Sequence, residues 1–512
     1  MYSIIKTAAL RGIRGIPVYV EADISRGMPV FEMVGFLASE VKEAKERVRI
    51  GLKNSGIELP PSHITVNFTP ADIRKSGSWF DLPVAAAVLC AMGMIPKEAL
   101  NRACLVGEIG LNGEVLPVRG ILSAAVMARE QGEKYLFVPE KNKSEGGILE
   151  GLTVIPVRTL KEFVALCREG KPEKHGYRET VNPKPGRIYG DFSEIRGQNM
   201  AKRACEIAVS GMHNLLMIGP PGSGKTMLAE RMPGIMPEMN FDEMLELTQI
   251  YSVCGRLEGK DIWKRERPFV APHHTITPQA LCGGGKNPMP GALSMAHKGI
   301  FFMDEFPEFP KEVIEMLRQP MEEKTIRLMR LGGSYEYPCD CLFLAAMNPC
   351  RCGYFPDLKR CRCTPASVAS YLNKISQPIL DRFELSVEMK DLSFQELRRQ
   401  EKAETSGEIR KRVEEVHRLQ RERFKDRKIY FNGQMSASDT EKYCETDREG
   451  KEFLEELYQD RAFSARRYYK MLKTARTIAD MGGSEKIRCC HLEEAAAFKA
   501  IDKRYWEVWN GI

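Results

Sequence analysis

The sequence predicts an α/β protein, and three observations lead to this prediction. An apolar run typical of a buried strand, Leu215–Ile218, precedes a glycine-rich loop and a helical stretch. A later apolar run, Ile300–Met303, ends in two consecutive acids. Residues 1 to about 165 alternate short apolar runs with helical patterns. Strands that alternate with helices along a chain are the pattern of an α/β fold.

Length, charge and cysteine content narrow the class of protein. The 512 residues correspond to three or four domains of about 100–200 residues each, and the net charge of +7 permits nucleic-acid binding by a local patch without requiring it. Met1–Val20 lacks the apolar segment of a signal peptide, and the longest apolar run, Leu82–Ile95, is too short to cross a membrane. We therefore expect a cytoplasmic protein without a membrane partner, whose 15 cysteines are reduced thiols or metal ligands.

Residues 1–168 are predicted to form a compact α/β domain. Ser39–Leu52 opens with a helix-capping serine and places its apolar side chains on one helical face. Ile64–Phe68 is typical of a strand, and Leu82–Met92 is typical of a buried helix. A hairpin is expected to turn at Asn112-Gly113, because this dipeptide is the strongest short hairpin signal.

Part of this domain resembles the proteolytic domain of Lon-type proteases. The resemblance lies in Lys75–Pro83, in the hairpin that follows, and in Leu116–Gly120. In that family a catalytic serine follows the first motif and a catalytic lysine follows the second. The corresponding neighbourhoods of this chain hold Trp79-Phe80 and Ile121-Leu122. The resemblance therefore implies a Lon-like (S5-type) domain that lacks the peptidase dyad.

The loop between Leu215–Ile218 and the next helix has the composition of a phosphate-binding loop. Its glycines let the backbone curl so that several N–H groups point at one anion, and the helix N-terminus adds positive potential. Lys225 would reach the β- and γ-phosphates, and Thr226 would place a hydroxyl on Mg²⁺. A chance lysine in a glycine-rich turn is the alternative. The predicted nucleotide-binding residues, called the phosphate loop below, are Gly219, Pro220, Pro221, Gly222, Ser223, Gly224, Lys225 and Thr226.

The two acids after Ile300–Met303 complete the predicted ATP site. A buried strand delivers Asp304 and Glu305 to the carboxyl edge of the sheet, where nucleotides bind in open α/β folds. Asp304 is expected to hold Mg²⁺ together with Thr226, and Glu305 is expected to orient the attacking water as a base.

Several segments resemble those of AAA+ ATPases. Phe192–Gln198 resembles the turn that holds adenine, and Asn348, at the end of an apolar run, matches the sensor-1 position that helps to align the water. Arg382, within Leu-Asp-Arg-Phe, matches an arginine finger that completes a neighbouring subunit's site, with an ordinary salt bridge as the alternative. Arg466 matches the sensor-2 arginine of a helical lid, with Arg467 as its competitor. A finger supplied in trans implies a ring of subunits.

These motifs divide the chain into its expected parts. Residues 169–190 are rich in proline, glycine and charge, and are predicted to be a linker. Residues 191–390 form the predicted AAA+ P-loop α/β core, and residues 391–512 form the predicted C-terminal helical lid domain. The predicted fold is α/β, with a Lon-protease-like α/β N-terminal domain ahead of that core and lid.

Two insertions and the order of the motifs resemble the magnesium-chelatase-like branch of AAA+ ATPases. The first insertion begins at Phe269 and ends near Gly291, and the second is a hairpin over Thr325–Tyr337 that turns at Gly332-Gly333. End to end, the chain resembles the ComM/YifB family, whose pieces here are Ala271–His274, Gly283–Gly285, Met347–Cys350 and Ser464–Arg466. The resemblance implies a homo-hexameric, helicase-like ring that uses ATP and Mg²⁺ to migrate DNA branches during integration of transforming DNA.

Basic residues of the two insertions are candidates for DNA binding, because in such rings both insertions face the pore. Lys286, Arg327 and Arg330 would contact backbone phosphates of single-stranded or branched DNA in a salt-sensitive way, independent of sequence. Solvated hairpin charges are the alternative. His273 and His274 receive a loop role, because adjacent histidines do not easily chelate one ion.

Four cysteines form the only predicted metal site besides the Mg²⁺ site. Cys350 and Cys352 stand eight residues before Cys361 and Cys363, and four thiolates so close together suit tetrahedral Zn²⁺. Reduced thiols and a redox switch are the alternatives.

The predicted function is that of an ATP-hydrolysing ring motor acting on DNA, as a helicase or branch-migration enzyme. A protein-remodelling ATPase of the magnesium chelatase or MoxR type is the main rival. An ATP-dependent protease is the weaker rival, because Ser78 and Ser123 have no evident base at the right offset.

Overall fold

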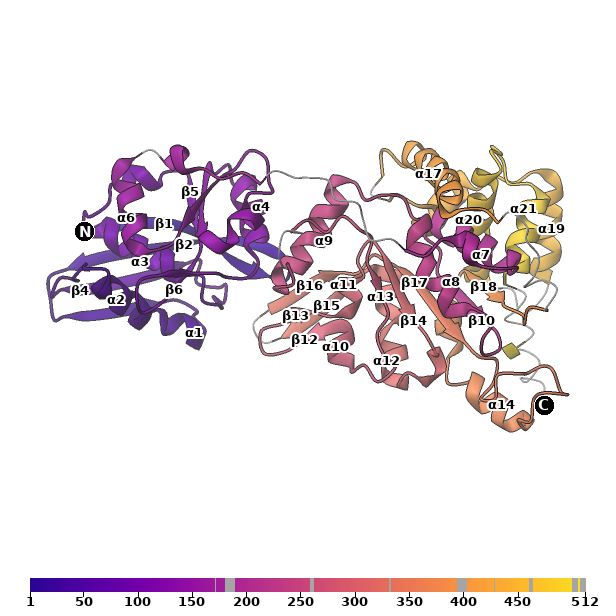
Figure 1. Cartoon of the computed structure of the whole chain (residues 1–512). Helices are drawn as coiled ribbons and strands as arrows, with labels where there is room; N and C mark the ends of the chain where they lie inside the picture. Colours follow the sequence, from indigo (N-terminus) through magenta and orange to yellow (C-terminus); the bar gives the residue numbers. More distant parts are fainter. Residues whose placement is uncertain are drawn as a thin grey trace.

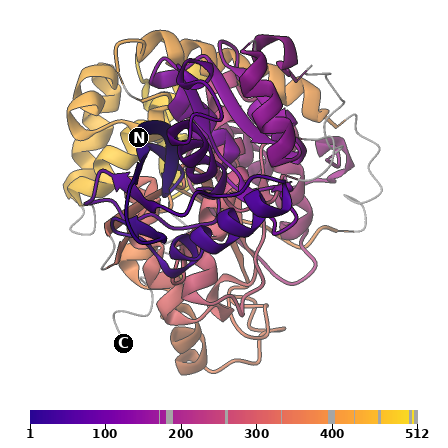
Figure 2. The same cartoon turned by 90° about the vertical axis from the view of Figure 1, so that its left-hand side faces the viewer.

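A computed structural model gives the arrangement of the chain as an N-terminal domain, a central domain and a C-terminal helical domain in a row (Figure 1). Figure 2 looks from the side of the N-terminal domain, which lies in front of the central domain in that view. The residues described by the structure are 1–170, 172–179, 189–257, 262–330, 333–393, 403–427, 429–459, 464–499 and 505–506.

The N-terminal domain is built on a mixed sheet ordered β3-β4-β2-β1-β5-β8-β9. Long antiparallel pairing of β1 with β2 and of β2 with β4 forms one half, and parallel pairing of β5, β8 and β9 forms the other. The strands are β1 (Tyr2–Arg11), β2 (Arg14–Ser25), β3 (Val30–Val34), β4 (His63–Thr69), β5 (Ala103–Leu105), β8 (Tyr135–Pro139) and β9 (Thr153–Val157).

Helices cover this sheet, and α3 is buried along its whole length against β1 and β2. The apolar composition of α3 explains this position, because a helix that is apolar all round must be covered on every side. The helices are α1 (Ser39–Lys42), α2 (Ala44–Asn54), α3 (Asp81–Ala91), α4 (Ile121–Glu130), α5 (Lys143–Gly146) and α6 (Leu160–Glu169).

The structure confirms the predicted hairpin and modifies two neighbouring expectations. β6 (Glu108–Ile109) and β7 (Val115–Leu116) pair antiparallel on either side of Asn112-Gly113. The helix expected over Ser39–Leu52 is interrupted at Glu43, where α1 ends and α2 follows. Residues 172–179 of the predicted linker lie on the N-terminal domain, because the Tyr177 N–H donates to the Val154 carbonyl (2.7 Å). Residues 180–188 of the predicted linker lie outside the described residues.

The central domain has a parallel sheet ordered β11-β14-β17-β10-β18. Parallel strands covered on both faces read as continuous apolar runs, and Ile300–Met303 and Leu342–Met347 are buried along their whole length. The strands are β10 (Leu215–Ile218), β11 (Phe269–Val270), β14 (Ile300–Met303), β17 (Leu342–Met347) and β18 (Leu385–Glu388). The helices of the domain are α7 (Asn199–Gly211), α8 (Lys225–Arg231), α9 (Phe241–Val253), α10 (Pro278–Cys282), α11 (Ala292–Met295), α12 (Lys311–Met316), α13 (Arg318–Glu323), α14 (Pro365–Leu372) and α15 (Gln377–Leu380).

Both insertions of the central domain form hairpins that lie on its side facing the N-terminal domain (Figure 1). The first insertion, expected to be loop-like, contains the short pair β12 (Gly283–Gly284) and β13 (Met289–Pro290). The second is the predicted hairpin, in which β15 (Thr325–Arg330) pairs with β16 (Gly333–Pro338). Gly332, in its expected turn, lies outside the described residues.

The N-terminal domain contacts both hairpins and α9. Arg11 Nε donates to the Ser334 carbonyl in β16 (3.1 Å), and Asn287 Nδ2, between β12 and β13, donates to Glu40 Oε1 (3.3 Å). At the start of α4, the Gly120 N–H donates to the Ser252 carbonyl in α9 (3.2 Å). The N-terminal domain is therefore attached to both hairpins, which carry the residues predicted to contact DNA.

The C-terminal domain is helical and docks on the central sheet through α20. Lys470 of α20 forms an ion pair with Glu384, which lies just before β18. His213, just before β10, shares a hydrogen bond with Thr477 Oγ1 of α20 (2.8 Å). The helices are α17 (Ser406–Arg423), α18 (Ala437–Tyr443), α19 (Arg448–Gln459), α20 (Ala465–Met481) and α21 (Cys489–Ala497).

Within the described ranges, none of the helices combines the length and the apolar character that a membrane crossing requires.

Candidate nucleotide site

The carboxyl ends of the parallel strands bring the predicted nucleotide residues to one edge of the central sheet. Ile218, the last residue of β10, is paired with Met347 of β17, and Met303 of β14 is paired with Ala345. The phosphate loop, Asp304 and Asn348 therefore follow neighbouring strands at the same edge. This is the position at which open α/β sheets bind ligands.

The phosphate loop curls around Lys225. Its Nζ donates to the carbonyls of Gly219 (2.8 Å) and Pro220 (2.9 Å) and to Asn348 Oδ1 (3.1 Å). Burial lowers the pKa of Lys225 to about 8, although Asp304 and Asp391 favour the charged form. The lysine is therefore held inside the loop by neutral oxygen atoms that a phosphate group would outcompete.

Two features of the loop fit an anionic ligand. Gly222 and Gly224 have φ values of +80° and +90°, and a side chain added at either would meet no atom of the described residues within 4 Å. Ser223 Oγ is buried, and no described residue gives it a hydrogen-bond partner. An open cradle next to an unsatisfied buried hydroxyl is what a bound phosphate would complete.

The acid pair lies beside the loop. Thr226 Oγ1 donates to Asp304 Oδ2 (2.6 Å), so the two predicted Mg²⁺ ligands are in contact. Hard oxygen ligands of this kind suit Mg²⁺. Glu305 has a left-handed φ of +53°, an uncommon conformation for a residue other than glycine, and its side chain is 61% exposed. The Glu305 carboxylate is therefore free of the sheet core and available to a water molecule.

One residue of this site was not predicted for it from the sequence, and Gln198 of the predicted adenine-holding turn makes contacts that were not predicted. His274, given a loop role above, lies with Nδ1 3.6 Å from Glu305 Oε2, because β11 delivers its segment to the same edge. Gln198 Nε2 donates to the carbonyls of Ser223 (3.1 Å) and Lys390 (2.7 Å), and so ties the phosphate loop to the segment after β18. Both contacts depend on which strands are neighbours in the order β11-β14-β17-β10-β18. No local sequence motif encodes that order.

The two predicted arginines lie at the opposite edge of the sheet. Asn214, immediately before β10, donates its side-chain amide to the Arg382 carbonyl (3.0 Å), whereas the phosphate loop begins after Ile218. A stretch of strand of roughly 16 Å separates these positions. Arg382 is 9% exposed and pairs with Glu322 (3.0 Å), and Arg466 pairs with the same carboxylate. Neither arginine is placed to contact a nucleotide bound by its own phosphate loop.

The predicted DNA-binding residues lie on the two hairpins. Lys286 and Arg330 are exposed, and a side-chain carbon added at Gly284 would lie 3.7 Å from an Arg330 guanidinium nitrogen, so the hairpins are adjacent. Arg327 is exposed but forms ion pairs with Glu323 (3.3 Å) and Glu336 (3.2 Å). The charge of Arg327 is thus partly compensated by α13 and by the facing strand β16, unlike the arrangement expected of a phosphate contact.

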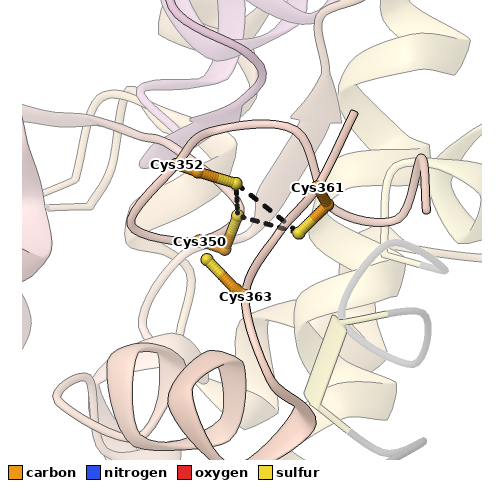
Figure 3. Close-up of side chains that lie close together, drawn as sticks. All are labelled: Cys350, Cys352, Cys361 and Cys363. Carbon is orange, nitrogen blue, oxygen red and sulfur yellow. Dashed lines mark hydrogen bonds between the residues drawn. The ribbon is translucent and has the colours of Figure 1, made fainter. Parts of the chain in front are cut away.

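The four cysteines predicted as a metal site converge in a loop after β17, which we call the cysteine knob (residues 350–363). Figure 3 shows their side chains pointing toward one another. All four Sγ atoms lie within 4.8 Å of one another, and the Sγ–Sγ distances among Cys350, Cys352 and Cys361 are 3.4–3.8 Å. Four sulfurs bound to Zn²⁺ at 2.3 Å in a tetrahedron would be about 3.8 Å apart. The geometry therefore fits Zn²⁺.

Two further cysteines and the Lon-like positions lie in the interior of their domains. Cys339 and Cys341 are buried in the core, as expected. In the two neighbourhoods that correspond to the protease dyad, the residues are buried and apolar: Trp79, Phe80, Ile121 and Leu122. Ser78 Oγ donates to Glu108.

Comparison with known proteins agrees with this arrangement. Residues 191–397 match the family described as magnesium chelatase, subunit ChlI, residues 20–142 match the ChlI subunit of Mg-chelatase, and residues 403–499 match the ChlI C-terminal family. The chain is 38% identical to YifB of Escherichia coli over 98% of its length and 97% of that protein. It is 36% identical to the competence protein ComM of Haemophilus influenzae over 99% of both.

A shorter similarity connects the chain with Lon proteases. The Lon protease of Mycolicibacterium smegmatis is 27% identical over 31% of this chain and 22% of that protein. The full-length similarity and the three matched families, together with the phosphate loop and acid pair at one sheet edge, place this chain in the magnesium-chelatase-like AAA+ ATPase family that includes YifB and ComM.

Proposed function

We propose that this protein is an ATP-hydrolysing ring motor that acts on DNA. The observation that supports the ring most directly is the separation of its catalytic groups. Lys225, Asp304 and Glu305 lie at the carboxyl edge of the central sheet, and Arg382 and Arg466 lie at the amino edge. A second copy of the chain would bring the two edges together.

The residues at the carboxyl edge account for nucleotide binding and hydrolysis. Bound ATP supplies the phosphoanhydride bond that is cleaved. Lys225 would leave its carbonyl partners for the phosphates, and Thr226 and Asp304 would hold Mg²⁺. Glu305 would accept a proton from the attacking water, and Asn348, which already contacts Lys225, would orient that water.

A mixing experiment tests whether Arg382 acts in trans. Lys225→Ala should remove nucleotide binding, and Arg382→Ala should remove the finger, so each homo-oligomer should be inactive. Co-expressed, the two variants would form some interfaces in which an intact phosphate loop meets an intact Arg382. We expect ATPase activity to reappear in the mixed assembly. If the mixed assembly remains as inactive as its parents while still assembling, the trans assignment is wrong.

Support for DNA as the substrate comes from the hairpins and from one relative. ComM is named a competence protein, and the exposed Lys286 and Arg330 lie on adjacent hairpins. The double variant Lys286→Glu, Arg330→Glu should weaken binding to single-stranded DNA by about tenfold or more at moderate salt. Fluorescence anisotropy with single-stranded and forked DNA measures this loss.

Two matched variants sharpen the DNA test. Arg327→Gln should weaken DNA binding less, because Glu323 and Glu336 already neutralise that side chain. Lys53→Glu, at an exposed position on α2, should leave binding unchanged. An equal loss in the Lys53 variant would indicate a general charge effect and would contradict a DNA path over the hairpins. Protein remodelling would then be the better proposal.

We also propose that the cysteine knob binds one structural Zn²⁺ per chain. The carrying observation is that the sulfurs of Cys350, Cys352, Cys361 and Cys363 all lie within 4.8 Å of one another. Inductively coupled plasma mass spectrometry of the purified protein should find about one zinc per chain, as one tetrahedral Cys₄ site requires. The variant Cys361→Ser, Cys363→Ser should lose it. Absence of zinc from the native protein would remove this proposal.

A further inference from the structure

The cysteine knob is pressed against the phosphate loop. Gly353 lies between Cys352 and Cys361 in the chain and has a φ of +85°. A side-chain carbon added at Gly353 would lie 2.3 Å from Pro221 Cδ and 2.7 Å from Pro221 Cγ. Such distances are far below van der Waals contact, so only glycine permits this approach. The knob backbone therefore supports the loop that the nucleotide must occupy.

A second connection runs through β17. The last residue of the strand, Met347, accepts a hydrogen bond from the Gly219 N–H at the start of the phosphate loop (3.2 Å). Asn348 follows and accepts from Lys225 Nζ (3.1 Å). Cys350, the first sulfur ligand of the knob, is two residues further on and is fully buried. Only one residue thus separates Asn348, which faces Lys225, from the first sulfur ligand of the knob. A shift of the knob would therefore move this end of the strand.

A third connection runs through the far side of the knob. The Arg360 guanidinium lies 4.0 Å from the centre of the Tyr354 ring, and it forms an ion pair with Asp391. Asp391 follows Lys390, whose carbonyl accepts from Gln198 Nε2 (2.7 Å). Gln198 Nε2 also donates to the Ser223 carbonyl of the phosphate loop (3.1 Å). The knob therefore contacts the phosphate loop directly at Pro221. It is linked indirectly to Gly219 and Lys225 through β17, and to Ser223 through the segment that holds Gln198.

We propose that metal bound in the cysteine knob fixes the conformation of the phosphate loop, so that nucleotide affinity depends on zinc occupancy. This inference rests on the proposed zinc site. The knob between Gly353 and Arg360 has no helix or strand of its own, so its shape depends on what joins the four sulfurs. Without a metal that links the four sulfurs, the knob would gain conformational freedom, and the phosphate loop would lose its support at Pro221.

The test uses the full-length protein and measures zinc content and nucleotide affinity separately. Cys361→Ser, Cys363→Ser should lose its zinc and bind a fluorescent ATP analogue at least about tenfold more weakly, as small displacements of a binding loop do. Chelator-treated wild-type protein should show the same loss, and added Zn²⁺ should restore its affinity but not that of the variant. The control Cys489→Ser, Cys490→Ser, at the start of α21, should keep both zinc and affinity.

Gly353→Ala keeps the four sulfurs and separates support of the loop from metal binding. It should retain zinc and still weaken nucleotide binding, because the added methyl group would displace Pro221. Release of zinc with unchanged nucleotide affinity would overturn this inference and leave the zinc proposal standing. Unchanged affinity in Gly353→Ala would also overturn it. A native protein without zinc would overturn both proposals.

Discussion

Two loops of this molecule each contain glycine and lead into a helix, yet only the phosphate loop leaves space for an anion from outside the chain. In the central domain, the phosphate loop leaves open space around Gly222 and Gly224 and a buried hydroxyl at Ser223 without a partner among the described residues. In the N-terminal domain, the loop before α3 is filled by its own side chains. Trp79 is 3% exposed, and Phe80 and Asp81 are fully buried.

The N-terminal loop supplies its own anion. Asp81 Oδ2 accepts from the Ile109 N–H (3.1 Å) and from Arg47 Nε (2.7 Å). Burial raises the pKa of Asp81 to about 6, while Arg47 and the Ile109 N–H favour the charged form. The Ile109 N–H of β6 and the Arg47 guanidinium of α2 are therefore already paired with a carboxylate of the chain itself. Whether a glycine-containing loop can bind an anionic ligand therefore depends less on the turn itself than on whether the nearby polar groups already have partners.

The largest expected effect is the loss of the phosphate-loop lysine. Lys225→Ala should weaken ATP binding by roughly 100-fold or more, because a charged hydrogen-bonding partner of the phosphates disappears. Isothermal titration calorimetry measures the affinity. Ser78→Ala in the N-terminal loop is the matched control and should bind ATP as the native protein does. Equal losses in both variants would erase the distinction between the two loops.

The next effect separates binding from chemistry at the central loop. Glu305→Gln should bind ATP with near-native affinity but hydrolyse it about 100-fold more slowly, because the amide cannot accept the proton of the attacking water. Steady-state ATPase assays together with nucleotide binding check both halves. Native turnover by this variant would show that the acid pair is wrongly assigned.

Removal of the internal carboxylate should damage the N-terminal domain and spare the site. Asp81→Ala leaves the Arg47 guanidinium without its buried partner and should lower the free energy of unfolding of the N-terminal domain by about 3 kcal/mol. Thermal denaturation measures the loss, and ATP affinity at low temperature should be unchanged. A variant that is fully stable would show that Asp81 is not the internal anion of this loop.

A smaller effect on ATP affinity is expected from pH. The pKa of Lys225 is lowered to about 8 by burial, so the free protein loses this charge as pH rises through that value. Phosphates bind the charged form, and ATP affinity should therefore fall by about tenfold between pH 7 and pH 9. Lys225→Arg should show a flat profile over this range, because arginine stays protonated. A flat profile in the native protein would contradict the lysine assignment.

The proximity of the predicted nucleotide-site residues could be predicted from the sequence, because parallel strands place their carboxyl ends at one edge. Asp304, Asn348 and Lys225 follow three apolar runs, and strand pairing then brings them together without further information. The hairpin at Asn112-Gly113 was similarly local in its signal. In both cases the determining interactions lie within a few residues or follow from a regular sheet.

The positions of Arg466 and His274 depend on contacts between segments that are distant in the sequence. The position of Arg466 could not be predicted, because the ion pair of Lys470 with Glu384 and the contact of His213 with Thr477 place its helix at the amino edge. The contact of His274 with Glu305 depends on β11, a strand of only two residues. No local periodicity or motif encodes either arrangement.

The most direct test of the proposed motor is its ATPase rate with and without single-stranded and forked DNA, measured across a series of salt concentrations. We expect DNA to stimulate hydrolysis and the stimulation to fade as salt rises, because phosphate contacts release counterions. Glu305→Gln should give no rate under any condition. A native rate that is indifferent to DNA at every salt concentration would contradict a DNA motor and would favour a ring that remodels a partner protein.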